Sequence, residues 1–338
     1  MGTMGERRAM VLLLPGQGAQ HLRMAAGLYG AEPVFTAAMD EVFDTVEAYA
    51  RGEGERLRAD WLTDRPTVDL DCVTRSQPLL FAVDHALGRL VVSWGSRPDV
   101  LLGHSIGELA AAVLARIFTL RDATRLVLDR IRLLADGPTG GMLAVAASVR
   151  EVEPFLAGDV VVGAVNAPRQ TVLAGPDPAL ELTHKALTEH EFTCRRLPSL
   201  SPFHSPVLAP AVAGSERAIA ALPVSPAALT LHSCYTARPL TAREAGDPGY
   251  WAAQPVAPVL FWPALDAVLT GRDAVLVEAG PGQTLAQLAR RHPAVRAGTS
   301  VVVPLLPARP GPPERDRDSV AAARESLAEH GIIGARTR

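Results

Sequence analysis

Short continuous runs of apolar residues alternate with longer amphipathic stretches over the first 135 residues of the chain. Met10–Leu14 and Pro98–Leu102 are two such runs, and a glycine-containing turn follows each. Apolar runs of this length are typical of strands in a parallel sheet, which helices cover on both faces. The stretches that follow them predict helices within 24–29, 34–62, 77–92 and 120–134. The pattern therefore predicts an α/β domain with a parallel sheet.

The pattern changes at Gly141, where the predicted elements become shorter. The order is strand, helix, strand, strand, helix, strand, at 142–147, 149–156, 160–165, 170–173, 178–189 and 193–197. This β-α-β-β-α-β order is that of a ferredoxin-like unit. We expect a ferredoxin-like small domain at 141–205, inserted into a hydrolase-like large α/β domain formed by 9–140 and 206–338.

Further elements of the large domain are predicted after the insert. Ala274–Glu278 is another continuous apolar run, and a Gly-Pro-Gly turn lies just beyond it. The chain is rich in proline from 304 to 313. Asp318 or Ser319 is suited to cap a last helix that reaches His330, with a glycine directly after it.

The stretch Gly103-His104-Ser105-Ile106-Gly107 joins a predicted strand to an alanine-rich helix. Its two glycines permit a strained turn that exposes the serine at the start of the helix. Free backbone N–H groups and the positive end of the helix dipole favour negative charge there. Ser105 is therefore a candidate nucleophile, although this short motif also occurs in turns that are only structural.

An activated serine needs a base within hydrogen-bonding distance. His204 lies in a segment rich in Pro and Ser where the insert rejoins the large domain, and a domain junction is a natural place for a cleft. Six other histidines lie in helical or polar settings that are typical of the surface: His21, His85, His184, His190, His292 and His330. His204 is the favoured base, and a structural role in the loop is the alternative.

Composition limits the partners and the compartment. The net charge of −3 gives no indication of a nucleic acid or an anionic membrane as partner. Cys72, Cys194 and Cys234 lie far apart, so we expect neither a metal site nor a disulfide, and each cysteine is predicted to be a small buried apolar residue. The apolar run near the N-terminus is too short to span a membrane and lacks a cleavage site, which predicts a cytoplasmic protein.

Four separated motifs make the sequence resemble the malonyl-CoA:acyl-carrier-protein transacylase family and the acyltransferase domains of polyketide synthases. They are Pro15–Gln20, Gly103–Glu108, Asn166-Ala-Pro168 with Ala174-Gly175, and Ser201–Ser205. Gln77-Pro78, Gly141–Val145 and Glu278–Gly282 agree as well. The similarity covers about residues 9 to 335. Because no ketosynthase accompanies the domain in this chain, we expect a free-standing enzyme.

The resemblance implies a role for each matched residue. A thioester would acylate Ser105, and His204 would act first as general base and then as general acid. In this family a backbone carbonyl, rather than an acidic side chain, orients the histidine. The N–H groups of Gln17 and Ile106 would form the oxyanion hole, in agreement with the two glycine-rich turns. The alternative is that the turn containing Gln17 is an ordinary tight turn with a structural role only.

Other matched positions surround the expected acyl group. Gln77 and Asn166 match residues that form hydrogen bonds around the site. Arg130 matches the arginine that holds the free carboxylate of a malonyl group, for which a planar fork of donors is well suited. An ordinary ion pair on the helix surface is the alternative for Arg130. Phe203 matches the bulky residue of malonyl-selective members.

The implied function is transfer of a malonyl or related acyl group from coenzyme A to the phosphopantetheine thiol of an acyl carrier protein. The setting would be polyketide or fatty-acid biosynthesis, with carrier protein, acyl-CoA and other synthase components as partners and with no cofactor. Ile131 and Leu260 depart from the family pattern, and they favour an alternative enzyme that moves an unusual starter unit, such as an aminoacyl group, between carriers. A hydrolase acting on carrier thioesters is a further alternative, against which Arg130 argues.

Overall fold

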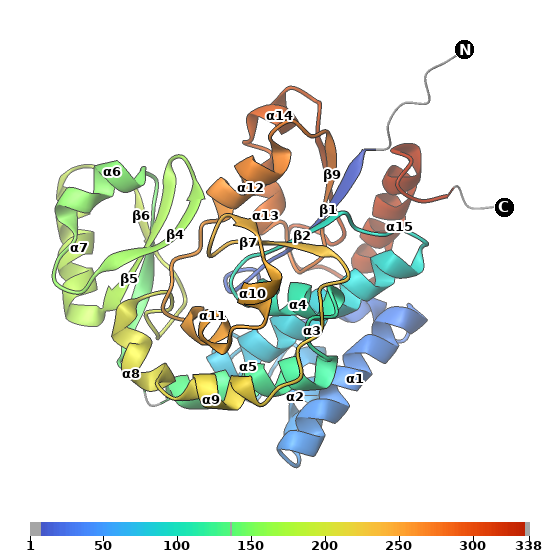
Figure 1. Ribbon diagram of the computed structural model, residues 1–338, viewed down its shortest axis with the longest axis horizontal. Coiled ribbons are helices and arrows are strands. Elements are labelled where there is room, and N and C mark those ends of the chain that lie inside the picture. Colours follow the sequence, from blue (N-terminus) through green and yellow to red (C-terminus); the bar gives the residue numbers. More distant parts are fainter. Residues whose placement is uncertain (1–7, 136, 335–338) are drawn as a thin grey trace.

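The computed structural model describes residues 8–135 and 137–334 and contains two sheets (Figure 1). Asp136 and residues 335–338 of the predicted large domain lie outside the described residues. The larger sheet has the strand order β10-β9-β1-β2-β7-β8. All neighbours are parallel except β7 and β8. The strands are β1 (Ala9–Leu14), β2 (Val100–Gly103), β7 (Thr230–Ser233), β8 (Arg238–Pro239), β9 (Ala274–Glu278) and β10 (Val301–Pro304). The predicted α/β class is confirmed.

Helices cover both faces of this sheet, as the continuous apolar strands require. Alternate residues of β1 belong to different cores, with Leu12 on one face and Leu13 on the other. The helices α1, α3, α4, α5 and α15 pack on the Leu12 side, and α12 and α13 pack on the Leu13 side. Their bounds are α1 (Pro33–Tyr49), α2 (Glu53–Leu62), α3 (Val73–Ser93), α4 (Gly107–Leu114), α5 (Leu120–Ala135), α12 (Phe261–Leu269), α13 (Thr284–Ala289), α14 (Pro293–Arg296) and α15 (Pro313–Glu329).

The smaller sheet is antiparallel, with the order β4-β5-β3-β6, and lies to one side of the molecule (Figure 1). It comprises β3 (Gly140–Val145), β4 (Val161–Ala167), β5 (Gln170–Pro176) and β6 (Cys194–Arg196), with α6 (Val149–Val152) and α7 (Asp177–Glu189) between strands. This is the ferredoxin-like arrangement predicted from the element order. The residue boundaries between the two predicted domains stay a prediction.

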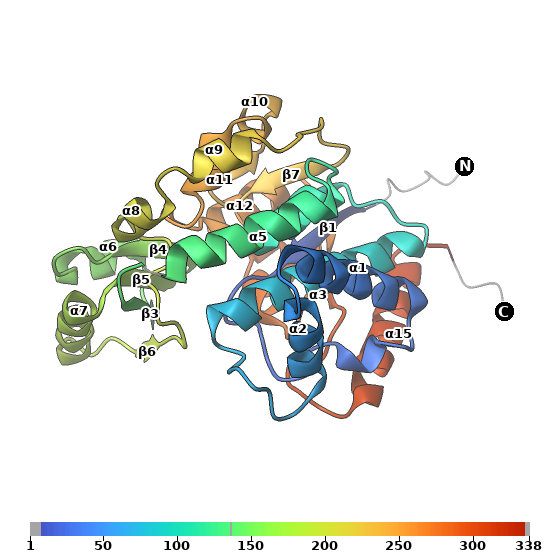
Figure 2. The same ribbon diagram turned by 90° about the horizontal axis from the view of Figure 1, so that it is seen from below.

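Residues 254–260 connect the two sheets, and we call them the connecting segment. Val259 forms main-chain hydrogen bonds with Gly163 and Val165 of β4, at 2.9 and 2.8 Å. Leu260 N donates to the carbonyl of Cys234, just after β7, at 2.6 Å. Four short helices precede this segment in the chain: α8 (Ala209–Val212), α9 (Ser215–Ala220), α10 (Ala242–Ala245) and α11 (Pro248–Ala253). Helix α5 extends from the large sheet toward the small one (Figure 2).

The structure differs from the prediction at the start of three helices: after the first glycine-rich turn, at Gln77, and at the last helix. The stretch after the first turn forms only a 3-10 turn, Ala26–Leu28, because Arg23 and Ala25 adopt left-handed backbone conformations with φ of 56° and 60°. Helix α3 begins four residues before Gln77 and contains Pro78. The carbonyl of Thr74, which loses its helical donor at Pro78, accepts instead from Arg75 at 3.3 Å.

The last helix, α15, begins at Pro313 rather than at Asp318 or Ser319. Proline occupies its first position, where no N–H is needed and φ is already helical. Two histidines that were predicted to lie at the surface, His85 and His292, are buried. Of the three cysteines only Cys234 is fully buried, and all three are free thiols.

Candidate active site

Ser105 lies in a turn whose geometry only glycine permits on either side. It follows β2, precedes α4, and has a left-handed φ of 54°. A Cβ atom on Gly103 would lie 2.4 Å from Glu108 N, and one on Gly107 would lie 2.2 Å from the carbonyl oxygen of Leu14. Both distances are too short for real atoms, so the two glycines allow β1, β2 and α4 to approach one another. The serine is thereby held at the carboxyl end of the central strands.

His204 contacts Ser105 directly. The Nε2 atom lies 2.8 Å from Ser105 Oγ, and the ring is buried. On the other side of the ring, Nδ1 donates to the carbonyl oxygens of Ala257 at 2.9 Å and Gln254 at 3.2 Å. Both acceptors are carbonyls, so the proton of the neutral ring lies on Nδ1. Nε2 is then free to accept the proton of the serine hydroxyl.

Burial is the largest of the causes that together lower the pKa of His204 to about 4, and the nearby His104 and Arg130 contribute to the same shift. The histidine is therefore neutral at pH 7, as a general base must be. No acidic side chain contacts this ring among the residues that the structure describes. Main-chain carbonyls of the connecting segment hold its orientation instead.

Two backbone N–H groups near Ser105 have no acceptor. Within the described part of the chain, the N–H groups of Gln17 and Ile106 form no hydrogen bond. Ile106 directly follows the serine at the start of α4, and Gln17 lines the same cavity as Ser105. A Cβ atom on Gly16 would lie 2.5 Å from the carbonyl oxygen of His104, so this turn also approaches the elbow closely. The arrangement can stabilise an oxyanion on a carbonyl bound at Ser105.

The other expected residues lie at different distances from the serine. Asn166 and Phe203 line the Ser105 cavity, which has a volume of about 60 Å³. Asn166 Oδ1 accepts from His104 Nε2 at 2.9 Å, so it fixes the residue preceding Ser105. Gln77 does not line the cavity, and its side chain contacts that of Gln17 at 3.4 Å. Gln77 thus contacts the turn that carries the unpaired N–H group of Gln17.

Arg130 does not line the Ser105 cavity either. Its Nη2 atom donates to the carbonyl of Trp251 at 3.0 Å and to the Gln254 side chain at 3.2 Å. No carboxylate forms an ion pair with Arg130 among the described residues. Arg130 is nevertheless close enough to His204 to affect its pKa. An arginine that forms no ion pair among the described residues is available to an anionic ligand.

Neither of the two departures from the family pattern lines the Ser105 cavity. Ile131 is buried in the core against helices α1 and α3, on the Leu12 side of the large sheet. Leu260 is bonded through its N–H to Cys234 and is absent from the lining of the Ser105 cavity. The carbonyls that orient His204 belong to residues 254 and 257, not to Leu260.

Sequence reasoning missed a buried network beside the site. The carboxylate of Glu108, which is fully buried, accepts from Tyr250 Oη, from Cys234 N at 2.9 Å and from Gln254 Nε2 at 3.4 Å. Gln254 thus contacts Glu108 and Arg130 with its side chain and His204 with its carbonyl. Glu108 stands in the serine motif and could have been examined, whereas Gln254 lies in a stretch with no periodic pattern.

Metal-binding groups and membrane-spanning helices were sought among the described residues. In 8–135 and 137–334, no group of three or more His, Cys, Asp or Glu side chains could hold a metal ion. Over the same ranges, no helix has the length and apolar character needed to cross a bilayer.

A serine on a strained turn, a neutral histidine and two free N–H groups form the arrangement with which α/β enzymes make acyl-serine intermediates. The fold and the site therefore define the class of serine-dependent acyl-transfer proteins. More specifically, a family model described as the acyl transferase domain matches residues 11–330, and the chain belongs to this family.

Similar proteins of known sequence or structure belong to the same kind of protein. The chain is 38% identical over 285 residues to a phenolphthiocerol/phthiocerol polyketide synthase protein of Mycobacterium tuberculosis, and the match covers 84% of this chain and 19% of that protein. The chain thus spans about a fifth of that relative. Among solved structures, the acyltransferase domain from the second module of the salinomycin polyketide synthase is 34% identical, with a TM-score of 0.84, and covers 98% of this chain and 75% of its own. The acyl transferase domain of SpnD, in complex with 2-(pent-4-yn-1-yl)malonyl, is 30% identical with a TM-score of 0.89, covering 97% and 78%.

Proposed function

We propose that the protein transfers a malonyl group from coenzyme A to the phosphopantetheine thiol of an acyl carrier protein in polyketide biosynthesis. The observation that carries this proposal is the 2.8 Å contact between Ser105 Oγ and His204 Nε2 beside two unpaired N–H groups. Membership of the acyl transferase family and similarity to polyketide synthase proteins support the same chemistry.

The first half-reaction acylates the serine. Ser105 Oγ attacks the thioester carbonyl while His204 Nε2 takes its proton, and the carbonyl oxygen becomes an oxyanion between the N–H groups of Gln17 and Ile106. Collapse of the tetrahedral intermediate breaks the C–S bond. The imidazolium gives its proton to the leaving thiolate of coenzyme A, which leaves the acyl-Ser105 ester and a neutral His204.

The second half-reaction reverses these roles. His204 takes the proton of the carrier thiol, whose sulfur attacks the ester carbonyl, and the oxyanion forms at the same two N–H groups. The C–O bond then breaks, Ser105 regains its proton from His204, and the acyl group leaves as a carrier thioester. Because coenzyme A leaves before the carrier thiol reacts with the acyl-Ser105 ester, the mechanism is ping-pong.

Arg130 supports malonyl as the acyl group. Its guanidinium donates to two neutral acceptors and forms no ion pair with a carboxylate of the described residues, so the free carboxylate of malonyl would be its ion-pair partner. Phe203 lines the small cavity at Ser105, where it would crowd a branch on the acyl group. The similar SpnD domain was solved with a substituted malonyl group, which fits a carboxylate-bearing substrate class.

A carrier-to-carrier enzyme for an unusual starter unit is the alternative. Ile131 and Leu260, the departures that favour it, do not line the Ser105 cavity, and neither does Arg130. We propose coenzyme A as the donor because Arg130 has no ion-pair partner among the described residues and suits the carboxylate of malonyl.

Intact-protein mass spectrometry after incubation with malonyl-CoA tests the proposal. We expect a malonyl mass gain in the wild type, none in Ser105→Ala, and an acylation rate in Arg130→Ala that is lower by about a hundredfold, because a charged bidentate contact is lost. Arg121→Ala, on the exposed face of the same helix, is the matched control and should acylate normally. An adduct that persists in Ser105→Ala, or acylation only by neutral acyl carriers, would contradict the proposal.

A further inference from the structure

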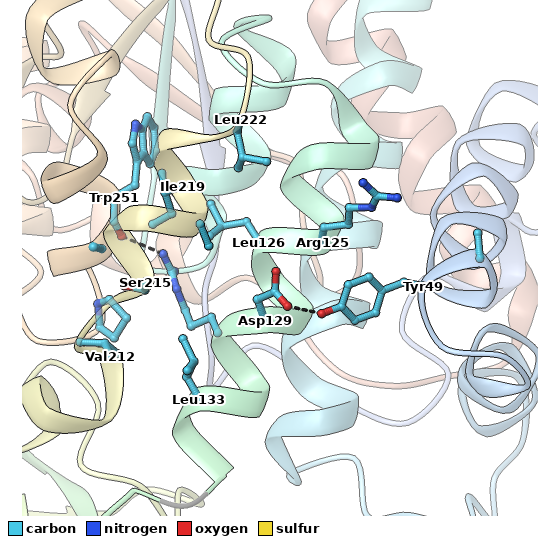
Figure 3. Close-up of a pocket in the computed structure, with 15 residues that line it drawn as sticks. Tyr49, Arg125, Leu126, Asp129, Leu133, Val212, Ser215, Ile219, Leu222 and Trp251 are labelled. Carbon is cyan, nitrogen blue, oxygen red and sulfur yellow. Dashed lines mark hydrogen bonds between the residues drawn. The ribbon is translucent and has the colours of Figure 1, made fainter.

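A second cavity lies on the far side of Arg130, and we call it the α5 cavity. It has a volume of about 450 Å³ and is bordered by α5, α9, α11 and the end of α1 (Figure 3). It shares no lining residue with the Ser105 cavity, which is much smaller. Arg130 and the carbonyl of Trp251 that it contacts both belong to its wall. The site described above therefore does not account for this cavity.

Most of the wall of the α5 cavity is apolar. Leu126, Ile219 and Trp251 are buried around it, and Leu133 is exposed at its border. In Figure 3, the side chains of Leu126, Ile219 and Leu222 lie on the same side of the cavity, between α5 and α9. Such a surface favours the aliphatic part of a ligand, because the removal of apolar surface from water is favourable.

Two polar groups in this wall lack the partner that they require. Arg130 makes both of its hydrogen bonds from Nη2 to neutral oxygens, and no carboxylate pairs with it among the described residues. Ser215 Oγ, at the start of α9, is buried and has no hydrogen-bond partner in the described part of the chain. The acidic group in the wall, Asp129, is already bonded to Tyr49 (Figure 3). A donor fork and a free hydroxyl beside apolar walls match an anion with an aliphatic tail.

We propose that the α5 cavity binds a medium-chain aliphatic carboxylic acid, with its carboxylate at Arg130 and Ser215 and its chain along Leu126 and Ile219. The bound carboxylate gives Arg130 an ion-pair partner, which none of the described residues provides, although the buried Glu108 acts on it from a longer distance. The ligand site is distinct from the acylated serine, so occupancy does not require acyl transfer.

A ligand bound in the α5 cavity would also affect the site at Ser105 and His204. Arg130 donates to the side chain of Gln254, and the carbonyl of the same residue accepts from His204 Nδ1. A carboxylate that engages Arg130 from the α5 cavity competes with a malonyl carboxylate for the same guanidinium. A medium-chain acid is therefore expected to raise the KM for malonyl-CoA. This effect rests on the proposed function, whereas binding does not.

Binding is tested by calorimetric titration of the Ser105→Ala protein with sodium decanoate, below the concentration at which it forms micelles. We expect saturable binding at one site, and an affinity lower by at least about tenfold when Arg130→Leu is added, since a charged hydrogen bond is lost. Ala218→Trp fills the cavity from the exposed side of α9 and should abolish binding. Ala220→Trp, exposed on the same helix but outside the lining, is the matched control and should bind like the parent.

Several results would overturn the inference: no saturable binding, equal binding by Ala218→Trp and Ala220→Trp, or an affinity for decanol equal to that for decanoate. The titration uses a protein that cannot be acylated, so it can succeed even where malonyl transfer fails. In the wild type, decanoate should raise the KM for malonyl-CoA, and Ala218→Trp should remove this effect. An unchanged KM in a protein that binds decanoate and transfers malonyl would refute the competition at Arg130.

Discussion

Ser105 and His204 both adopt left-handed backbone conformations, with φ of 54° and 64°. For residues with a Cβ atom, such conformations cost roughly 1–3 kcal/mol each and persist only where the surroundings fix them. Here the fixing contacts are main-chain ones: His204 N donates to the carbonyl of Pro255 at 2.7 Å, and its ring donates to two further carbonyls of the connecting segment. The His204 ring is therefore oriented by neutral dipoles. An acidic partner would have raised its pKa, and none contacts it among the described residues.

Because carbonyl groups rather than an acidic side chain contact His204, the pH dependence of the reaction rate should differ from that expected for an ordinary histidine. The groups around the ring are His104, Arg130, Tyr235 and carbonyls, and burial lowers the pKa of His204 to about 4. In the proposed mechanism His204 acts as the neutral base, so kcat/KM for the proposed malonyl transfer should stay level from pH 8 to pH 6 and fall only as the pH approaches about 4. Rates measured over this range in stopped assays test the point. A half-maximal rate near pH 6.5, the ordinary value for histidine, would contradict it.

Helix α3 illustrates how element boundaries depend on tertiary contacts. The chain continues through Pro78 because a buried arginine, Arg75, compensates the carbonyl that proline leaves free. The same guanidinium donates from Nε to the buried carboxylate of Asp60 on α2 at 2.7 Å. Periodicity alone places the start of this helix at Gln77, since the pairing of Arg75 with Asp60 cannot be deduced from sequence spacing.

Removal of this arginine should be costly. In Arg75→Met, Asp60 keeps only Thr67 as a partner and remains buried, so we expect the free energy of unfolding to fall by about 3–5 kcal/mol. Arg169→Met breaks an exposed ion pair with Glu151 and should change stability by less than about 1 kcal/mol. Urea denaturation of the two variants provides the comparison. A loss below about 1 kcal/mol in Arg75→Met would show that Asp60 is solvated or repaired by its neighbours.

The elements that sequence reasoning found are those whose pattern is local. The continuous apolar runs of β1, β2 and β9 identify buried strands, and the element order of the insert identifies the small sheet. Strand β7, Thr230–Ser233, mixes polar and apolar residues within four positions and gives no such signal. Likewise Ser105 is marked by its two glycines, whereas Gln254 acts through a carbonyl oxygen that every residue type possesses. Its contribution becomes visible only in three dimensions.

At the scale of the molecule, Glu108 joins parts of the chain that are far apart in sequence. It lies on α4, beside the serine, and accepts hydrogen bonds from Cys234, Tyr250 and Gln254. Burial raises its pKa to about 7. Between pH 4.5 and 7 the unfolded chain therefore loses this proton while the folded protein retains it. Glu108 thus favours folding most below pH 4.5, and this contribution is lost as the pH rises to about 7.

Glu108→Gln should remove this dependence. From pH 5.5 to pH 8 the wild type loses roughly 2 kcal/mol of stability through Glu108, and the variant should lose less over the same interval. Other buried carboxyl groups, such as Glu278, contribute equally to both proteins, so the difference isolates Glu108. Glu151→Gln is the control: the pKa of Glu151 is lowered to about 2 by hydrogen bonds from Ser148 and Arg169, so it is ionised throughout. Identical pH dependence of unfolding in Glu108→Gln and wild type would contradict the assignment.

The position of β1 in the sheet has a consequence for biosynthesis. β1 pairs with β2 on one edge and with β9 on the other, so that Leu12 lies opposite both Leu101 and Val277. The ribosome synthesises β1 and β2 before β9. More than half of the residues after β2 are made before β9 can pair with the other edge of β1. During that interval an apolar strand with unpaired N–H and C=O groups is open to other nascent chains. We expect any fragment that stops before β9 to aggregate, and a chaperone that shields Ala9–Leu14 to raise the yield of the folded protein.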